Sequence, residues 1–360
     1  MPTNTSKTIK QVSGPTAIDL FSGCGGLTLG LKKAGFDVVA AVEIDKDAAN
    51  TFRANHPDVD LKESDIQKLS PRAMRRELKL RPGQLDLLAG CPPCQGFSSL
   101  RTRNGAARNR DARNNLVCEM LRFARAFMPK AIMMENVPGL ADRKPFFDLC
   151  TGLARLGYEI NFDVKDAAEF GVPQRRRRLI LLAGRGFKIE FPNGAKKTWT
   201  VRDAIKRLPK AGKSNDPIHD IPEQRSKKVA ALIRDIPKNG GSRGDLPKRR
   251  QLACHKTSDG FKDIYGRMAW DKVAPTITGG CFNPSKGRFL HPQENRAITM
   301  REAALLQGFP RRYIFDAKSG KQRIAVMIGN ALPPEFIRRH ALAIAQALPK
   351  RAHRQVSRRG

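Results

Sequence analysis

The chain has 360 residues, of which 67 are Lys or Arg and 34 are Asp or Glu, so its formal net charge is +33. This charge argues against an ordinary cytosolic metabolic enzyme and indicates a polyanionic partner, because each cation set against a phosphate releases condensed counterions. Hydrophobic residues make up 40% of the sequence, which is enough for a core, so a folded chain of one large or two modest domains is expected.

Nucleic acid is the leading candidate for that partner. An anionic membrane surface is the alternative, but no basic amphipathic helix with a strong apolar face stands out. The sequence has no apolar run long enough to span a membrane and no secretory signal at its start, so we expect a cytoplasmic protein. Its seven cysteines are irregularly spaced, which favours free thiols over a disulfide framework.

Short apolar runs alternate with helix-like segments from Thr16 to about Gly184, a pattern that predicts an α/β fold with a doubly wound, mostly parallel sheet. The predicted strands are 16–21, 37–43, 85–89, 131–135, 158–164 and 176–183. Helical spacing occurs at 26–34, 47–55, 115–127, 301–307 and 334–348. The sequence shows no internal repeat.

Composition divides the chain further. We expect a disordered N-terminus at 1–14, a catalytic and cofactor-binding domain at 15–187, and a smaller basic domain at 188–321, where Pro, Gly, Lys and Arg replace long apolar runs. Residues 322–348 would return to the first domain, and 349–360 would form a basic tail.

Ligands of an open parallel sheet bind at the carboxyl ends of its strands, so the residues there are informative. The first strand runs into the glycine-rich turn Asp19-Leu-Phe-Ser-Gly-Cys-Gly-Gly26, and the second ends at Glu43, suitably placed to hold ribose hydroxyls. Together they resemble a nucleoside-cofactor site. Thr28 stands where the dinucleotide fingerprint requires its last glycine, which disfavours NAD or FAD; a tight turn without a ligand is the other alternative.

The third strand leads to Gly90-Cys-Pro-Pro-Cys-Gln-Gly-Phe-Ser98. Cys94 follows two rigid prolines and precedes a polar stretch, a suitable position for a nucleophile that basic surroundings would help to ionise. A buried structural cysteine and a redox or metal pair of Cys91 with Cys94 are the alternatives. Zinc would need further ligands, and no second such pair exists, so no metal is predicted.

A carboxylate and a basic run complete the set of candidate site residues. Glu135 ends the fourth strand, where a buried charge needs a partner, although a surface glutamate is the alternative. In Gln174-Arg-Arg-Arg-Arg178, the period of a strand places Arg176 and Arg178 on one face and Arg175 and Arg177 on the other. One pair could line the crevice while the other meets solvent or phosphate; a wholly solvated run remains the alternative.

These blocks, in this order, resemble the cytosine carbon-5 DNA methyltransferases that use S-adenosylmethionine. The resemblance covers roughly Thr16 to Leu348 and includes Thr299–Pro310 and Gly329–Pro334. It implies Cys94 as the nucleophile, Glu135 as the carboxylate that grips the cytosine edge, and Arg178 with Arg176 beside it as the arginine motif. The cofactor-binding residues that it implies are Asp19, Phe21, Gly23, Gly25, Gly26, Glu43, Ile44, Asp65, Ile66, Pro92 and Asn330. Cys91 stands where many members have Gly and is treated as a bystander.

The resemblance further implies a class I methyltransferase fold, double-stranded DNA as partner, S-adenosylmethionine as cofactor, and target recognition by the basic region. We expect a monomer, associated with the nucleoid through DNA, with a cognate restriction endonuclease possible but not stably bound. Two other functions are compatible with the scaffold. One is a transfer RNA methyltransferase, whose Cys-Phe-Thr element is only partly matched by Cys281-Phe-Asn283, and the other is a catalytically silent nucleic-acid-binding regulator.

Overall fold

A computed structural model describes residues 14–93, 116–251 and 263–349 of the chain. Its centre is one seven-stranded sheet in the order β3-β2-β1-β4-β5-β7-β6. Strand β7 is antiparallel to both β5 and β6, whereas the remaining neighbours pair in parallel. The strands are β1 Thr16–Leu20, β2 Asp37–Glu43, β3 Asp60–Glu63, β4 Leu87–Gly90, β5 Ala131–Asn136, β6 Tyr158–Asp166 and β7 Arg177–Arg185.

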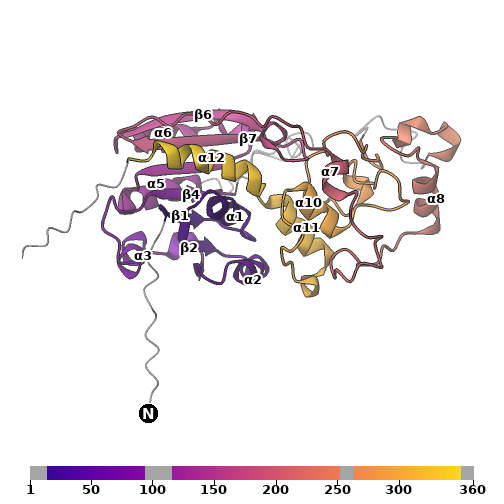
Figure 1. Cartoon of the computed structure of the whole chain (residues 1–360), viewed down its shortest axis with the longest axis horizontal. Coiled ribbons are helices and arrows are strands. Elements are labelled where there is room, and N and C mark those ends of the chain that lie inside the picture. Colours follow the sequence, from indigo (N-terminus) through magenta and orange to yellow (C-terminus); the bar gives the residue numbers. More distant parts are fainter. Residues whose placement is uncertain (1–13, 94–115, 252–262, 350–360) are drawn as a thin grey trace, which may run out of the picture.

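Helices cover both faces of this sheet (Figure 1). One face packs with α1 and α12, and the opposite face packs with α3, α5 and α6, as two separate apolar clusters. Since both faces are buried, the central strands are continuous apolar runs rather than alternating ones. The helices are α1 Gly26–Lys33, α2 Lys46–Asn55, α3 Pro71–Glu77, α5 Val117–Phe127, α6 Lys144–Ala154, α7 Val201–Ile205, α8 Lys227–Asp235, α10 Met300–Leu306, α11 Gly320–Asn330 and α12 Pro334–Ala347.

The architecture confirms the predicted doubly wound, mostly parallel sheet. Six of the seven strands were predicted to within a few residues; β3 was missed because Asp60-Leu-Lys-Glu63 is a short edge strand with few apolar side chains. Helices α3, α6, α7, α8 and α11 were also missed. Strand order reverses between β1 and β4, and this switch point is where a ligand is expected.

The chain between β7 and α10 is built differently. It contains the short α7 and α8, and otherwise loops and single turns. A third apolar cluster joins α7, α10 and α11 to Cys24 and Ala48 at the starts of α1 and α2. From there α12 runs back along the sheet against α1 (Figure 1), so closely that a Cβ at Gly30 would lie 2.5 Å from that of Ile337. No helix in the described part of the chain has the length and apolar character needed to cross a membrane.

Candidate active site

The turn that follows β1 has a backbone shape that requires glycine. Phe21, Gly23 and Gly25 have φ angles of 61°, 55° and 93°, and α1 begins immediately afterwards at Gly26. A Cβ at Gly25 would lie 2.7 Å from the ring of His56 and from the hydroxyl of Tyr313. The turn therefore presents bare backbone at the carboxyl edge of the sheet, ahead of a helix N-terminus.

Glu43, at the end of β2, is bound to this turn. Its Oε2 accepts from the Gly23 N–H at 2.7 Å, and its Oε1 accepts from the N–H groups of Ile44 and Asp45 at 2.9 and 2.7 Å. Burial raises the pKa of Glu43, and the three backbone donors oppose that rise. The neighbouring Ile44 side chain is 66% exposed, an apolar surface beside the acid.

Asp19 lies beneath the same turn and is fully buried. Its Oδ2 accepts from the Thr28 hydroxyl at 2.6 Å, whereas its Oδ1 has no hydrogen-bond partner among the described residues. Burial raises the pKa of Asp19 to about 7. The hydrogen bond explains why Thr28 occupies the position where the dinucleotide fingerprint would have glycine, because its hydroxyl donates to the buried carboxyl group of Asp19.

Two residues that sequence reasoning missed support the turn from below. The Tyr313 hydroxyl donates to the carbonyl of Cys24 at 2.6 Å, and His56 Nε2 lies 3.1 Å from that hydroxyl and 3.3 Å from the Gly25 carbonyl. Because the Tyr313 hydroxyl proton is donated to the Cys24 carbonyl, the hydroxyl oxygen can only accept from His56. His56 Nε2 is therefore the protonated ring nitrogen and acts as the donor in both contacts. Burial lowers the pKa of His56 to about 4, so the ring is neutral near pH 7. No spacing in the sequence indicates this pair.

The other predicted cofactor residues lie in different settings. The Asp65 side chain accepts from the Gln67 N–H at 3.0 Å and caps a single helical turn. Ile66 is buried in the core under the sheet, so its side chain is not available to a ligand. Asn330 ends α11 and is exposed.

Strands β4 and β5 end side by side. The buried Asn136 donates from Nδ2 to the carbonyl of Pro92 at 2.9 Å, which fixes the segment leaving β4. Burial and the adjacent Glu135 carboxylate raise the pKa of Cys91 well above its usual value, so this thiol stays protonated. Cys94, two residues beyond Pro92, lies outside the described residues, and so does any pairing with Cys91.

Glu135 meets Arg178 at this edge. The residue is 7% exposed, and its carboxylate forms an ion pair with Arg178 Nε at 2.7 Å. Burial raises the pKa of Glu135, while Arg178 and Arg176 counteract that rise.

Arg176 is directed elsewhere. Its guanidinium donates to the carbonyls of Ile277 and Gly329, at 3.0 and 2.9 Å, and the side chain is buried. Burial lowers the pKa of Arg176 to about 9, so it remains charged at pH 7. The predicted two faces are recognisable, since Arg175 and Arg177 are exposed, whereas Arg176 is buried and Arg178 is paired with Glu135. Within the described residues, no group of His, Cys, Asp and Glu side chains could hold a metal ion.

The strand order, the antiparallel β7 and the glycine-rich turn at the switch point define a class I methyltransferase fold. A family model described as C-5 cytosine-specific DNA methylase matches residues 16–346, and the chain belongs to that family. It is a DNA (cytosine-5-)-methyltransferase, an enzyme of a family that works through a covalent cysteine adduct.

Two relatives cover nearly the whole chain. The Type II methylase M.HgiDII of Herpetosiphon aurantiacus is 36% identical over 94% of this chain and 97% of its own length. The Type II methyltransferase M1.HphI of Haemophilus parahaemolyticus is 35% identical over 93% of this chain and 87% of its own length. Both of these relatives are therefore Type II methyltransferases, the methyltransferases of restriction-modification systems.

Solved structures agree. An Escherichia coli protein described as a DNA modification methyltransferase encoded within a prophage superposes with a TM-score of 0.66 and 26% identity, over 93% of this chain and 99% of that one. Spodoptera frugiperda DNMT2 superposes with a TM-score of 0.58 over 92% of this chain and 100% of that one, and at 19% identity it supports the fold alone.

Proposed function

We propose that the chain methylates carbon 5 of a cytosine flipped out of double-stranded DNA, with S-adenosylmethionine as methyl donor, Cys94 as nucleophile, and Glu135 with Arg178 as the groups that hold the base. The observation that carries this assignment is the 2.7 Å pair of Glu135 and Arg178, buried where β5 and β7 meet and next to the segment leading to Cys94. A stacked base could not reach this position, so flipping is required, at a cost of a few kcal/mol.

The turn after β1 fits the proposed cofactor. Asp19 offers a buried carboxylate oxygen without a partner, which suits the ammonium group of the methionine moiety, and the bare backbone from Gly23 to Gly26 allows close approach. Glu43 would accept hydrogen bonds from the ribose hydroxyls, through the lone pairs that its three backbone contacts leave free. The exposed Ile44 side chain would pack on the adenine, and Asp65 would face the adenine amine. Phe21, Pro92 and Asn330 would complete the site, with Ile66 contributing through its backbone.

The protein groups have distinct tasks in this mechanism. The Cys94 thiolate adds to carbon 6, which turns the ring into an enamine that is nucleophilic at carbon 5. Glu135 hydrogen-bonds ring nitrogen 3 and the exocyclic amine, and Arg178 binds the carbonyl oxygen and disperses the developing charge. Bound S-adenosylmethionine supplies an electrophilic methyl group. Loss of the carbon-5 proton and of Cys94 then restores the aromatic ring.

Arg176 acts in this scheme as a positioning residue. It holds Ile277 and Gly329 against the start of β7, and Gly329 immediately precedes Asn330. We further propose that residues 188–321 recognise the DNA target and that 15–187 and 322–348 form the catalytic domain. The protein would act as a cytoplasmic, nucleoid-associated monomer, without a stable complex with a restriction endonuclease.

The test is to express the chain in a host that lacks cytosine methylation and to sequence the host DNA for 5-methylcytosine at single-base resolution. Methylation in one short sequence context, lost in Cys94→Ala, is the expected result. Unmethylated DNA, despite folded protein that binds S-adenosylmethionine, would contradict the proposal and direct attention to RNA.

A further inference from the structure

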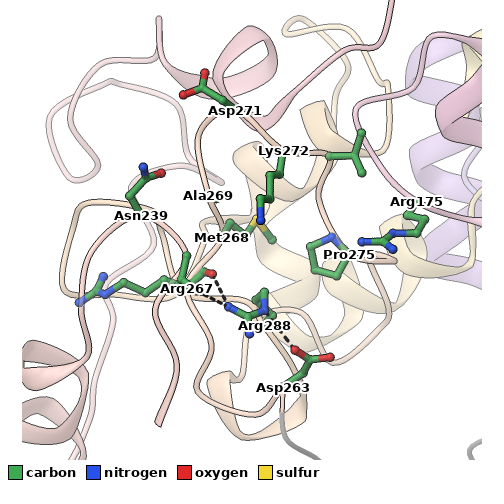
Figure 2. Close-up of a pocket in the computed structure, with 12 residues that line it drawn as sticks. Arg175, Asn239, Asp263, Arg267, Met268, Ala269, Asp271, Lys272, Pro275 and Arg288 are labelled. Atoms are coloured by element: carbon green, nitrogen blue, oxygen red, sulfur yellow. Dashed lines mark hydrogen bonds and ion pairs between the residues drawn. The ribbon is translucent and has the colours of Figure 1, made fainter. Parts of the chain in front are cut away.

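A hollow of about 570 Å³ lies where the Gln174–Arg178 segment meets the region after β7 (Figure 2). Its walls come from both parts of the chain, and its charged lining residues are Arg175, Arg267, Lys272, Arg288, Asp263 and Asp271. In Figure 2, Arg175 and Lys272 point into the hollow on either side of Pro275. None of the roles assigned so far uses this hollow.

Its two carboxylates already have partners. Asp271 forms a bidentate pair with Arg202 at 2.6 and 2.8 Å, outside the wall, and Asp263 accepts from Arg288 Nε at 3.1 Å. In contrast, the exposed side chains of Arg175 and Lys272 have no carboxylate within 4.0 Å among the described residues. Arg267 also has no carboxylate partner among the described residues, but it is buried, and its guanidinium donates to the backbone carbonyls of Ile233, Ile236 and His291. Arg175 and Lys272 are therefore the two exposed cations of the hollow without a carboxylate partner, which favours an anionic occupant.

The backbone that carries these two cations is held in place. Arg175 N–H donates to the Ala274 carbonyl at 2.9 Å, Ala274 N–H donates to Pro173 at 2.9 Å, and the Thr276 hydroxyl donates to the Arg175 carbonyl at 2.8 Å. The Lys272 carbonyl accepts from Val201 N–H at 3.0 Å. Arg175 and Lys272 thus belong to a prebuilt site, and only their side chains lose freedom when a ligand binds.

The hollow is also close to the proposed catalytic pair. Arg175 is three residues from Arg178, so their Cα atoms are at most about 11 Å apart along the extended chain. Arg178 contacts Glu135, which holds the flipped cytosine in the proposed function. A negative group bound between Arg175 and Lys272 would therefore lie within a few nucleotides of the target base.

We propose that Arg175 and Lys272 form a clamp for one backbone phosphate of the DNA strand that carries the target cytosine. This inference rests on the proposed function and adds a specific contact to it. The clamp would fix the position of the strand beside the flipped nucleotide, while carrying no sequence information itself.

The first test measures the affinity for a duplex that contains the methylated sequence, over salt concentrations from about 50 to about 200 mM, for wild type and for the double variant Arg175→Ala/Lys272→Ala. Loss of one phosphate contact should lower the slope of log K against log salt by about 0.9. The affinity defect of the variant should then shrink by roughly 3-fold across that range. Lys272→Arg alone, which keeps the charge, should retain the wild-type slope.

The matched control is Arg72→Ala. Arg72 is an exposed cation on α3, at the opposite end of the molecule (Figure 1), and its removal should leave the slope unchanged. An equal loss of slope in Arg72→Ala and the double variant would show that net charge alone is responsible and would overturn the clamp. An unchanged slope in the double variant would overturn it as well.

The second test identifies the phosphate. Single uncharged methylphosphonates are placed in turn along the target strand, and wild type should lose affinity at one position near the cytosine. The double variant should show no loss at that position; the same loss in both proteins would overturn the proposal. If wild type binds and methylates DNA but these results fail, the clamp alone is wrong, whereas wild-type protein that neither binds nor methylates DNA overturns the proposed function too.

Discussion

Replacing Tyr313 by Phe removes one oxygen from beneath the turn that follows β1, which holds the cofactor in the proposed function. The hydroxyl donates to the Cys24 carbonyl at 2.6 Å and lies 3.1 Å from His56 Nε2, and all three groups are buried. The substitution leaves the Cys24 carbonyl without this donor, and an unsatisfied buried polar group costs about 1–3 kcal/mol. His56 still has the Gly25 carbonyl as an acceptor, so the loss is centred on Cys24.

We expect the free energy of cofactor binding to become less favourable by the same amount, because Cys24 lies between Gly23 and Gly25, the two positive-φ glycines of the turn. If the variant must restore the shape of the turn before the cofactor binds, a cost of 1–3 kcal/mol raises the Kd for the cofactor by about 5- to 150-fold. The assay is calorimetric titration with S-adenosylmethionine, together with the KM for the cofactor and kcat. We expect KM to rise while kcat at saturating cofactor changes little.

Tyr158→Phe is the matched control. Its hydroxyl is also buried and donates to a backbone carbonyl, that of Pro129, at 2.5 Å, but it lies on β6 at the far edge of the sheet. Both variants should lower the free energy of unfolding by similar amounts, and only Tyr313→Phe should weaken cofactor binding. Equal cofactor affinities in the two variants would refute the reasoning that Tyr313 supports the turn.

Three further predictions address the site itself. Cys94→Ser should abolish turnover while DNA and cofactor still bind, as checked by labelled-methyl transfer and gel shift; wild-type turnover would remove Cys94 from the mechanism. Glu135→Gln should lower the single-turnover rate of methyl transfer by about 10²- to 10³-fold, because one hydrogen-bonding group for developing charge is lost, and an unchanged rate would contradict its role. Cofactor affinity should rise with pH up to about 7, because the pKa of Asp19 is raised to about 7 and its ionised form pairs with an ammonium group. Asp19→Asn should flatten that dependence in titrations at several pH values, and an equally steep profile in the variant would exclude Asp19.

The same raised pKa predicts how stability depends on pH. Between the unfolded value of 3.8 and the folded value of about 7, the folded protein holds the Asp19 proton more tightly than the unfolded chain does. The contribution of Asp19 to stability is therefore largest below that interval and declines as pH rises through it. A bound ammonium group would offset the decline, so the cofactor should stabilise the protein more at pH 8 than at about pH 5.

Local sequence signals were sufficient for most of the sheet. Buried strands between helices are apolar runs, and the residues that end them meet at one edge because the strands are parallel, which placed Asp19, Glu43 and Glu135 correctly at that edge. The edge strand β3 has no such signal. Thr28 was recognised as a departure from a fingerprint, but its reason, the hydrogen bond to Asp19, depends on the fold.

Contacts between distant segments could not be predicted in the same way. His56 and Tyr313 are far apart in the sequence and meet only because Gly25 adopts a positive φ and leaves room for both. Period two correctly separated Arg176 and Arg178 from Arg175 and Arg177, yet it could not show that Arg176 would find two backbone carbonyls instead of a substrate.

The segment from Gln174 to Arg178 shows how one short stretch can serve several purposes. Gln174 is buried; its Nε2 donates to Gln307 Oε1 at 2.6 Å, and its Oε1 accepts from Ile277 N–H at 2.7 Å. Arg176 binds the other side of Ile277 through its carbonyl. Ile277 is thus held by both polar groups of its backbone.

In the proposed function, this arrangement would couple the binding of the DNA backbone to the chemistry. Residues on one side of the segment, Gln174 and Arg176, join the loop around Ile277 to α10 and α11, while Arg178 on the same side reaches Glu135. Arg175, on the other side, forms the proposed phosphate clamp with Lys272. A DNA strand held at the clamp would therefore be positioned by the same rigid backbone that positions the groups for the flipped base. Misplacement of the strand would reduce catalysis without any change in the catalytic residues themselves.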